Sequence, residues 1–337
     1  VECIEAAKNT EHYKSEIKGP YRGRGIASGY WANIGKASSC SIGVNPDGTI
    51  TLVEGSTDIG GSRASIGMQA AEVLGLAAED VHPTVANTDS VGYTFLTGGS
   101  RTTFATGWAA YEAAQDIKAK MIARAATIWE VDPDNVDLVG NELQHKSDPE
   151  LKISFKELAG KLADTGGPIS SQVSVDPAGQ GGAFSTQIAD VEVDPDTGQV
   201  TILRFTIVQD AGKAIHPSYV EGQMQGAVAQ GIGWALNEEY YMGDQDQMVN
   251  SSFLDYRMPT SLDLPMIDTV IVEVANPGHP YGVRGVGEVP IVPPMAAVAN
   301  AIADALKLRL TEMPMSPGAV LEAIWSNNGE VVQAADD

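Results

Sequence analysis

Residues 188–203 read IADVEVDPDTGQVTIL, two runs rich in β-branched residues separated by the sequence DPDTG. Because β-branched residues favour strands and Pro, Asp and Gly favour tight turns, this stretch predicts a β-hairpin with strands at 188–193 and 199–203. The same order occurs at 38–53, where SSCSIGV and TITLV flank the turn sequence NPDG. The chain therefore contains two hairpins built on one pattern.

The segments after the two hairpins also match. The first hairpin leads to Asp58-Ile59-Gly60 and the second to Asp210-Ala211-Gly212. Helical patterns come next, at about 64–74 with Gly75 as a C-cap and at about 217–239. This repetition predicts an α+β fold of two related modules, each a mixed sheet packed with helices. A chance match between two common hairpins is the alternative.

The remaining elements and the domain organisation are predicted from the same patterns. We expect residues 1–20 to form a linker or N-terminal tail, 21–165 the first module, 166–325 the second module and 326–337 a C-terminal tail. The further elements expected are a strand at 81–88, helices at 107–130 and 151–162, a strand at 270–274 and a helix at 293–307.

Composition limits the functional classes. The 337 residues are 43% hydrophobic, and the net charge of −23 opposes binding to nucleic acid or to an anionic membrane. The two cysteines, Cys3 and Cys40, are too few for a disulfide scaffold or an iron–sulfur cluster, so any redox chain must continue in another polypeptide. We expect no membrane-spanning run, no signal segment and a cytoplasmic location; because the chain begins with Val, its natural start is expected upstream or processed.

Residues 281–290 read YGVRGVGEVP and place one carboxylate, Glu288, among three glycines. Glycines allow the backbone to approach a ligand closely, and Pro290 restricts the residue before it to extended conformations. The loop is therefore expected to hold Glu288 beside a ligand. An ordinary Gly/Pro turn with a solvated glutamate is the alternative.

Two loops of small residues each precede a predicted helix. Residues 55–63 read GSTDIGGSR and residues 96–103 read LTGGSRTT. Backbone N–H groups at a helix start, together with small hydroxyls, can bind anions such as phosphates. Each loop taken alone is equally explained as a helix cap.

The predicted helix at 217–239 contains four glycines as well as glutamines. A glycine disfavours a helix by about 1 kcal/mol relative to alanine, so four of them require a reason. We expect close packing of Gly222, Gly226, Gly231 and Gly233 against another backbone or a ligand, with a glutamine amide able to donate and accept hydrogen bonds.

In this order, the stretches resemble the molybdenum-cofactor subunit of the xanthine dehydrogenase/aldehyde oxidase family. Gly287-Glu288 with Pro290 resembles its catalytic Gly-Glu-Pro loop, and 97–100 resembles its pterin loop. Gly222-Gln223 and 230–233 resemble its glycine/glutamine helix, whereas 58–62 lies where a Gly-Gln-Gly segment is usual. The resemblance runs from about 21 to 320 and corresponds to the C-terminal half of that subunit; the Gly-Gly-x-Phe-Gly loop of the upstream half is missing.

The resemblance implies a molybdenum-dependent hydroxylation of an aldehyde or N-heterocycle with water as the oxygen source. Glu288 would be the base that takes the proton from a molybdenum-bound hydroxide. The cofactor would be molybdopterin or its cytosine dinucleotide, with no metal ligand from the protein, and the five histidines are read as structural or exposed. The residues expected to bind the cofactor are Gly60, Gly61, Ser62, Thr97, Gly98, Gly99, Ser100, Gln223 and Gly287. Gly61 replaces the usual glutamine, which puts one cofactor contact in doubt.

The resemblance also implies partners. These are a second molybdopterin-binding chain carrying the N-terminal half and a subunit with iron–sulfur clusters, with an FAD subunit left open. Activity is expected only in such a complex. A non-catalytic assembly subunit that completes a partner's cofactor site is the alternative. A nicotinamide or flavin dehydrogenase is disfavoured, because 282–287 runs Gly-x-x-Gly-x-Gly where Gly-x-Gly-x-x-Gly is needed.

Overall fold

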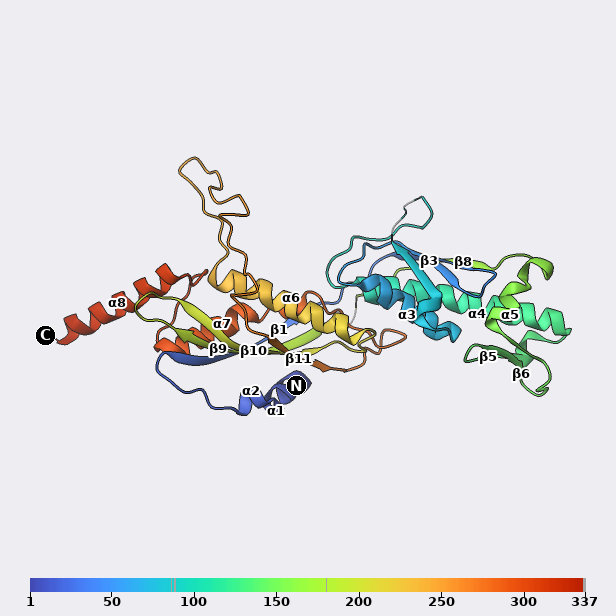
Figure 1. The fold of residues 1–337 in the computed structure, drawn as a ribbon, viewed down its shortest axis with the longest axis horizontal. Coiled ribbons are helices and arrows are strands. Elements are labelled where there is room, and N and C mark those ends of the chain that lie inside the picture. Colours follow the sequence, from blue (N-terminus) through green and yellow to red (C-terminus); the bar gives the residue numbers. More distant parts are fainter. Residues whose placement is uncertain (86, 88, 180, 336–337) are drawn as a thin grey trace.

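Two four-stranded sheets, each covered by helices, lie one after the other along the long axis of the molecule (Figure 1). The structure is a computed structural model and describes residues 1–85, 87, 89–179 and 181–335. The expected fold class, α+β with two related modules, is confirmed.

The N-terminal module contains β2 (Ser38–Val44), β3 (Ile50–Glu54), β4 (Val81–Val85) and β8 (Ser170–Val175), in the order β4-β3-β2-β8. The predicted hairpin is present, with Cys40 opposite Glu54. Helix α3 (Ser62–Leu74) links β3 to the parallel strand β4 and ends at Gly75, whose φ of 65° suits a glycine C-cap. Helix α4 (Gly107–Trp129) buries its alanine-rich face in the same core.

A small satellite completes this module. It consists of β5 (Val136–Val139), β6 (Glu142–His145), β7 (Lys152–Ser154) and α5 (Phe155–Gly160). The helix predicted at 151–162 is shorter because Ser154 forms a capping box with Glu157, which fixes the helix start. In the strand predicted at 81–88, residues 86 and 88 lie outside the described residues.

The C-terminal module contains β1 (Arg22–Trp31), β9 (Ala183–Val193), β10 (Val200–Asp210) and β11 (Ile267–Val272), in the order β1-β9-β10-β11. The hairpin predicted at 188–203 is the centre of this sheet. Helix α6 (Pro217–Leu236) links β10 to the parallel strand β11, and α7 (Pro294–Leu306) packs on β1 and β9.

The two sheets have one topology. In each, an antiparallel hairpin is followed by a helix and a strand parallel to the second hairpin strand, and an antiparallel edge strand pairs with the first. Each antiparallel edge strand lies in the sequence range that was predicted for the other module. Strand β1 falls within 21–165 but belongs to the C-terminal sheet, and β8 falls within 166–325 but belongs to the N-terminal sheet. The chain therefore crosses between the modules at points other than those expected from sequence.

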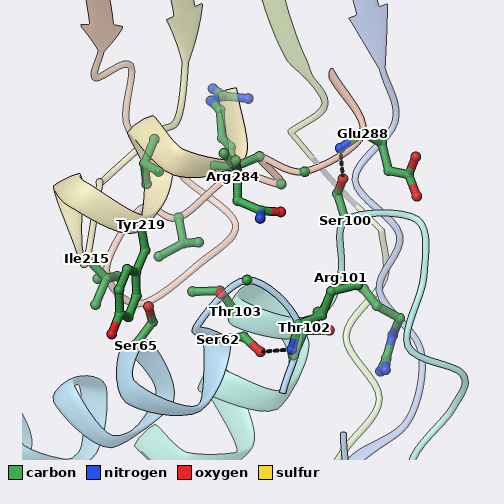
Figure 2. A pocket seen from close by; sticks show the side chains of 18 of the residues that line it. Ser62, Ser65, Ser100, Arg101, Thr102, Thr103, Ile215, Tyr219, Arg284 and Glu288 are labelled. Atoms are coloured by element: carbon green, nitrogen blue, oxygen red, sulfur yellow. Dashed lines mark hydrogen bonds between the residues drawn. The ribbon is translucent and has the colours of Figure 1, made fainter. Parts of the chain in front are cut away.

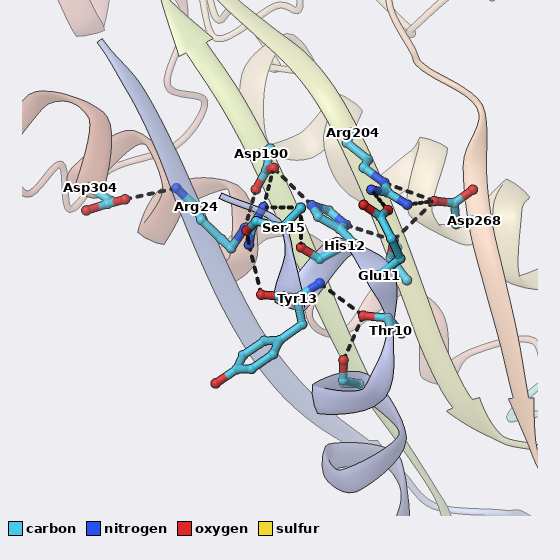
Figure 3. A network of polar contacts seen from close by, with 12 residues as sticks. Thr10, Glu11, His12, Tyr13, Ser15, Arg24, Asp190, Arg204, Asp268 and Asp304 are labelled. Carbon is cyan, nitrogen blue, oxygen red and sulfur yellow. Dashed lines mark hydrogen bonds and ion pairs between the residues drawn. The ribbon is translucent and has the colours of Figure 1, made fainter. Parts of the chain in front are cut away.

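The first 20 residues, expected as a linker or tail, fold onto the C-terminal sheet. Helices α1 (Glu2–Asn9) and α2 (Glu11–Lys14) bury Cys3, Ala7 and His12, and the first two of these pack against β9 and β10. Figure 3 shows the polar contacts that hold α2: His12 lies 3.1 Å from Asp190 and 2.7 Å from Thr206. The short apolar face of α1 was too sparse to be recognised as a helical pattern.

Two other expectations are corrected. The predicted C-terminal tail at 326–337 is largely part of α8 (Pro317–Ala335). Within the described residues, Val289–Leu306 is long and apolar enough to span a membrane, although no such run was expected. Most of this window is α7, whose buried residues Ala297, Val298 and Ala301 belong to the core of the C-terminal module, as in a core helix of a folded domain.

Candidate active site at the junction of the modules

A cavity of about 290 Å³ lies where loops of the two modules meet. One wall comes from the segment around Gly60 and from residues 97–103, which belong to the N-terminal module. The other comes from the start of α6 and from 283–288, in the C-terminal module (Figure 2). The site thus depends on residues more than 200 positions apart in the sequence.

The loop around Glu288 is fixed by buried side chains of the sheet behind it. Gln209 on β10 donates to the Val286 carbonyl at 3.0 Å, and Gln187 on β9 donates to the Pro290 carbonyl at 2.7 Å. Both glutamines are fully buried. Because both ends of the segment are anchored, Glu288 is presented on a rigid support.

Glu288 itself is half-buried and lines the cavity. Its backbone N–H donates to the Ser100 hydroxyl at 2.9 Å, which joins the two loops singled out from sequence. Within the described part of the chain, its carboxylate makes no hydrogen bond or ion pair. Figure 2 shows the carboxylate turned away from Tyr219 and Thr103.

Arg284 lines the cavity, but its guanidinium is engaged by other protein groups. Its Nε lies 3.1 Å from a carboxylate oxygen of Asp210 and donates to the Val274 carbonyl at 2.7 Å. Asp210 also accepts hydrogen bonds from the N–H groups of Gly212 and Val274. The pair therefore fixes the loop and holds the charge of Arg284 away from the cavity.

The loop at 97–100 is held by a buried arginine that sequence reasoning missed. Arg101 is 0% exposed, and its guanidinium donates to five backbone carbonyls and to the Ser38 hydroxyl. Burial lowers the pKa of this guanidinium. The Thr97 hydroxyl accepts from the Thr57 N–H at 3.2 Å, so the two small-residue loops are tied together.

Glycines let the Gln223 side chain of α6 lie close to the segment before α3 and to the loop at 283–288. A Cβ at Gly60 would lie 2.2 Å from the Gln223 amide nitrogen, and a Cβ at Gly287 would lie 3.1 Å from the Gln223 amide oxygen. The φ angle of Gly60, +58°, also favours glycine. The Gln223 amide is therefore seated between these two glycines, as only residues without side chains allow.

Most of the predicted site residues meet at the cavity. It is lined by Gly60, Ser62, Thr97, Gly98, Ser100, Gln223, Gly287 and Glu288. Gly61 and Gly99 are not on its wall: a Cβ at Gly61 would lie 2.4 Å from the Tyr219 ring, and one at Gly99 would lie 2.2 Å from Ile34. Gly61 thus makes room for an aromatic ring of α6.

Sequence reasoning also missed residues at the start of α6. Lys213, His216 and Tyr219 line the cavity, and His216 stacks on Tyr219 with ring centroids 3.8 Å apart. The interpretation of all five histidines as structural or exposed stays a prediction, and His216 is a histidine that lines the cavity. Its Nδ1 is buried and has no hydrogen-bond partner within the described residues. The Asp-x-Gly sequence before α6 and the glycines within the helix pointed to this region, but not to these three side chains.

The family model of the molybdopterin cofactor-binding domain matches residues 2–265, well over half of the sequence. The chain belongs to the molybdopterin cofactor-binding domain family. The expected resemblance to the molybdenum subunit of xanthine dehydrogenase-type enzymes is thereby confirmed.

Relatives with known names agree with this family. The chain is 32% identical to the xanthine dehydrogenase molybdenum-binding subunit of Escherichia coli O157:H7, over 89% of this chain and 42% of the relative. It is 29% identical to subunit gamma of the 6-hydroxypseudooxynicotine dehydrogenase complex of Paenarthrobacter nicotinovorans, over 94% of this chain and 42% of the relative. The chain thus spans about two fifths of the length of these relatives.

A solved structure shares the fold. Reconstituted CO dehydrogenase from Oligotropha carboxidovorans superposes with a TM-score of 0.84 at 26% identity, covering 92% of this chain and 41% of that one. The fold of this molybdopterin cofactor-binding domain is therefore that of about two fifths of a larger CO dehydrogenase chain.

The cavity of this molybdopterin cofactor-binding domain suits an organic cofactor that carries its own metal. In the described ranges, no three His, Cys, Asp or Glu side chains are grouped to hold a metal ion. The walls instead offer the hydroxyls of Thr97 and Thr103 and the amide of Gln223, groups that hydrogen-bond to polar ring and phosphate atoms. The buried Nδ1 of His216, which has no hydrogen-bond partner in the part of the chain that the structure describes, adds a further polar atom.

Proposed function

We propose that this chain forms part of a molybdenum hydroxylase that oxidatively hydroxylates an aldehyde or an N-heterocycle with water as the oxygen source. Glu288 is the catalytic base in this proposal. The supporting observation is the half-buried Glu288 carboxylate, unpaired within the described residues, on a cavity loop anchored by Gln187 and Gln209.

When bound, a molybdenum–pterin cofactor supplies the metal centre at which the substrate is oxidised. The residues of this chain position and assist it. Hydroxyls of Thr97 and Ser100 and the amide of Gln223 would hydrogen-bond to the cofactor, and the glycines at 60 and 287 make room for that amide. Glu288 accepts a proton at its carboxylate, a role that contributes about 10²–10⁴-fold to a rate in other enzymes.

The test is Glu288→Gln in the assembled enzyme. Glutamine has nearly the same shape but is not a base, so we expect the cofactor to remain bound while turnover falls by several orders of magnitude. Molybdenum content and steady-state turnover are measured on the same preparation, with Glu312→Gln on an exposed loop as the matched control. Near-normal turnover of the Glu288→Gln enzyme would remove Glu288 from the mechanism.

The proposal includes partners, because the chain spans only about two fifths of its relatives. A second molybdopterin-binding polypeptide supplies the other half of the molybdenum subunit, an iron–sulfur subunit removes electrons, and an FAD subunit is an optional third. The complex is cytoplasmic in this proposal. Identification of the polypeptides that copurify with the chain tests these assignments.

A non-catalytic assembly subunit is the second candidate. Gly61 favours it, because this position lacks the amide that the family usually has and Tyr219 occupies the space beside it. Such a subunit would complete a partner's cofactor site without using Glu288. The normal turnover of a Glu288→Gln complex that contains molybdenum and pterin would support this second function.

A further inference from the structure

Residues 237–266, here called the arm, rise from the end of α6 and project away from the body of the molecule (Figure 1). The arm carries large apolar side chains that pack on almost nothing: Phe253 is 94% exposed, Leu254 95% and Leu262 94%. Tyr240, Tyr241 and Met266 are also exposed. Apolar groups gathered in this way on one projection indicate a surface that is covered by another protein.

The arm is shaped by its own polar contacts. The Ser252 hydroxyl donates to Asp255 at 2.7 Å, and the Thr260 hydroxyl donates to Asp263 at 2.8 Å. At the base, Tyr256 donates to Glu238 at 2.9 Å. The apolar side chains are therefore held outward without contributing to the core, which lowers the ordering cost of binding.

The exposed side of α6 continues this surface towards the cavity. Of the four glycines expected to pack closely, Gly231 faces Pro294 and Gly233 faces Pro259 at the base of the arm. A Cβ at Gly222 or Gly226 would meet nothing within 4 Å. These two glycines lie on the exposed face with Tyr219 and Gln230, which line the cavity, and with Trp234 next to the arm.

The length of the relatives indicates which polypeptide could cover this surface. Each carries more than half of its length beyond the matched part, and their names describe molybdenum-binding or dehydrogenase subunits. We propose that the arm and the exposed face of α6 dock the other half of the molybdenum subunit. This inference rests on the proposed function.

Charge argues against a second copy of this chain as the occupant. The arm contains one basic residue, Arg257, and six acidic residues: Glu238, Glu239, Asp244, Asp246, Asp255 and Asp263. A second arm, or the rest of a chain with net charge −23, would be repelled. The docked half is therefore expected to present an apolar surface with basic residues at its rim.

The experiment places a photo-reactive phenylalanine derivative at Leu254 in the assembled enzyme, purified through a tag on this chain. After irradiation, the crosslinked peptides are identified by mass spectrometry, and molybdenum and turnover are measured on the same sample. We expect crosslinks to peptides of the other half of the molybdenum subunit. The probe at Val139, 58% exposed on β5, is the control and should give none to that half.

A second variant tests the same surface without a probe. Leu262→Asp changes a side chain that is 94% exposed, so the chain itself should fold, but the recovery of assembled enzyme should fall at least fivefold. Val139→Asp, the matched control, should leave recovery unchanged. Equal recovery for both variants would contradict the docking role.

The outcomes separate this inference from the proposed function. Crosslinks from Leu254 only to a second copy of this chain or to an iron–sulfur subunit, or none at all, in an enzyme that contains molybdenum and turns over, would overturn the docking proposal alone. A crosslink to the other half in an enzyme that lacks molybdenum would uphold docking and overturn the proposed function.

Discussion

Glu54 is a buried carboxyl group at the end of β3, where the chain enters the loop that contains Gly60. It is 0% exposed, and one of its oxygens accepts from the Ser56 N–H at 3.0 Å, while the other has no partner within the described residues. Burial, opposed in part by this hydrogen bond, raises the pKa of Glu54 from 4.5 to about 7. The group is therefore protonated in the folded protein at pH values where it is ionised in the unfolded chain.

We predict that Glu54 makes stability fall as the pH rises. The contribution of its raised pKa to stability is complete below pH 4.5 and is lost as the pH rises through about 7. The free energy of unfolding should fall by about 3 kcal/mol over this range because of Glu54. The glutamine of Glu54→Gln carries no charge at any of these pH values. The free energy of unfolding of this variant, relative to that of the natural protein, should therefore increase by about 3 kcal/mol as the pH rises over this range. Urea unfolding from pH 4.5 to 8 measures the difference, with the exposed Glu79→Gln as control. A difference that does not change with pH would show that Glu54 is not titrating as stated.

At the residue scale, local motifs were predictable and the residues that support them were not. Glu288, Ser100 and Gln223 stood out because glycines surround them in the sequence, and the structure brings all three to one cavity. Gln187 lies in a stretch without such a signal, and Arg101 follows the glycines at 98 and 99 but was not itself singled out. Their role depends on carbonyl groups that are distant in sequence, such as those of Pro290 and Gly35.

Helix α6 shows how one residue type serves different purposes within one element. Gly231 lies against α7, where a Cβ would be 2.6 Å from the rigid ring of Pro294, whereas Gly222 faces open space. We predict that Gly222→Ala stabilises the chain by about 1 kcal/mol, because alanine is the better helix former. Gly231→Ala should instead destabilise it by about 1–3 kcal/mol through overpacking.

Thermal unfolding of the two variants beside the natural protein measures these effects. The two substitutions are chemically identical and lie on the same helix, so each controls for the other. If both raised the midpoint of unfolding, the close contact between α6 and α7 would not constrain the helix.

At the scale of elements, the hairpins were predictable because turn chemistry is local, whereas β1 was not. Strand β1 contains Gly23 and Gly25, which weaken its strand pattern. The structure supplies the reason for them: a Cβ at either position would lie within 2.3 Å of the backbone of α7. A contact of this kind, between residues nearly 280 positions apart, leaves no periodic pattern in the sequence.

For the molecule as a whole, the path of the chain between the modules was the least predictable feature. Strand β1 starts in the C-terminal sheet before the chain enters the N-terminal module, and β8 completes the N-terminal sheet just before the chain returns. Neither assignment can be made from local sequence, because an edge strand can pair with either sheet. The two modules are consequently joined by two crossings of the chain.

A buried ionic cluster joins the N-terminal helices to the C-terminal sheet (Figure 3). Arg24 on β1 binds both oxygens of Asp190 on β9 at 2.7 Å, and His12 on α2 lies 3.1 Å from the same carboxylate. Burial alone would raise the pKa of Asp190, but the hydrogen bonds from Arg24 and His12 outweigh it and lower the pKa from 3.8 to about 2. The cluster thus joins the start of the chain to the middle of the C-terminal sheet.

This cluster predicts an acid-sensitive contribution to the stability of the whole molecule. A lowered pKa stabilises the fold above pH 3.8, and the contribution, about 2 kcal/mol, is lost as the pH falls to about 2. Asp190→Asn leaves Arg24 and His12 without their carboxylate, so at pH 7 it should cost about 3 kcal/mol. The deficit should shrink as the pH falls from 4 to 2, because the natural protein then loses the same charge. Urea unfolding across this range measures it, with Glu192→Gln on the same strand as control; a deficit that stays constant down to pH 2 would mean that the charge of Asp190 does not hold the N-terminal segment in place.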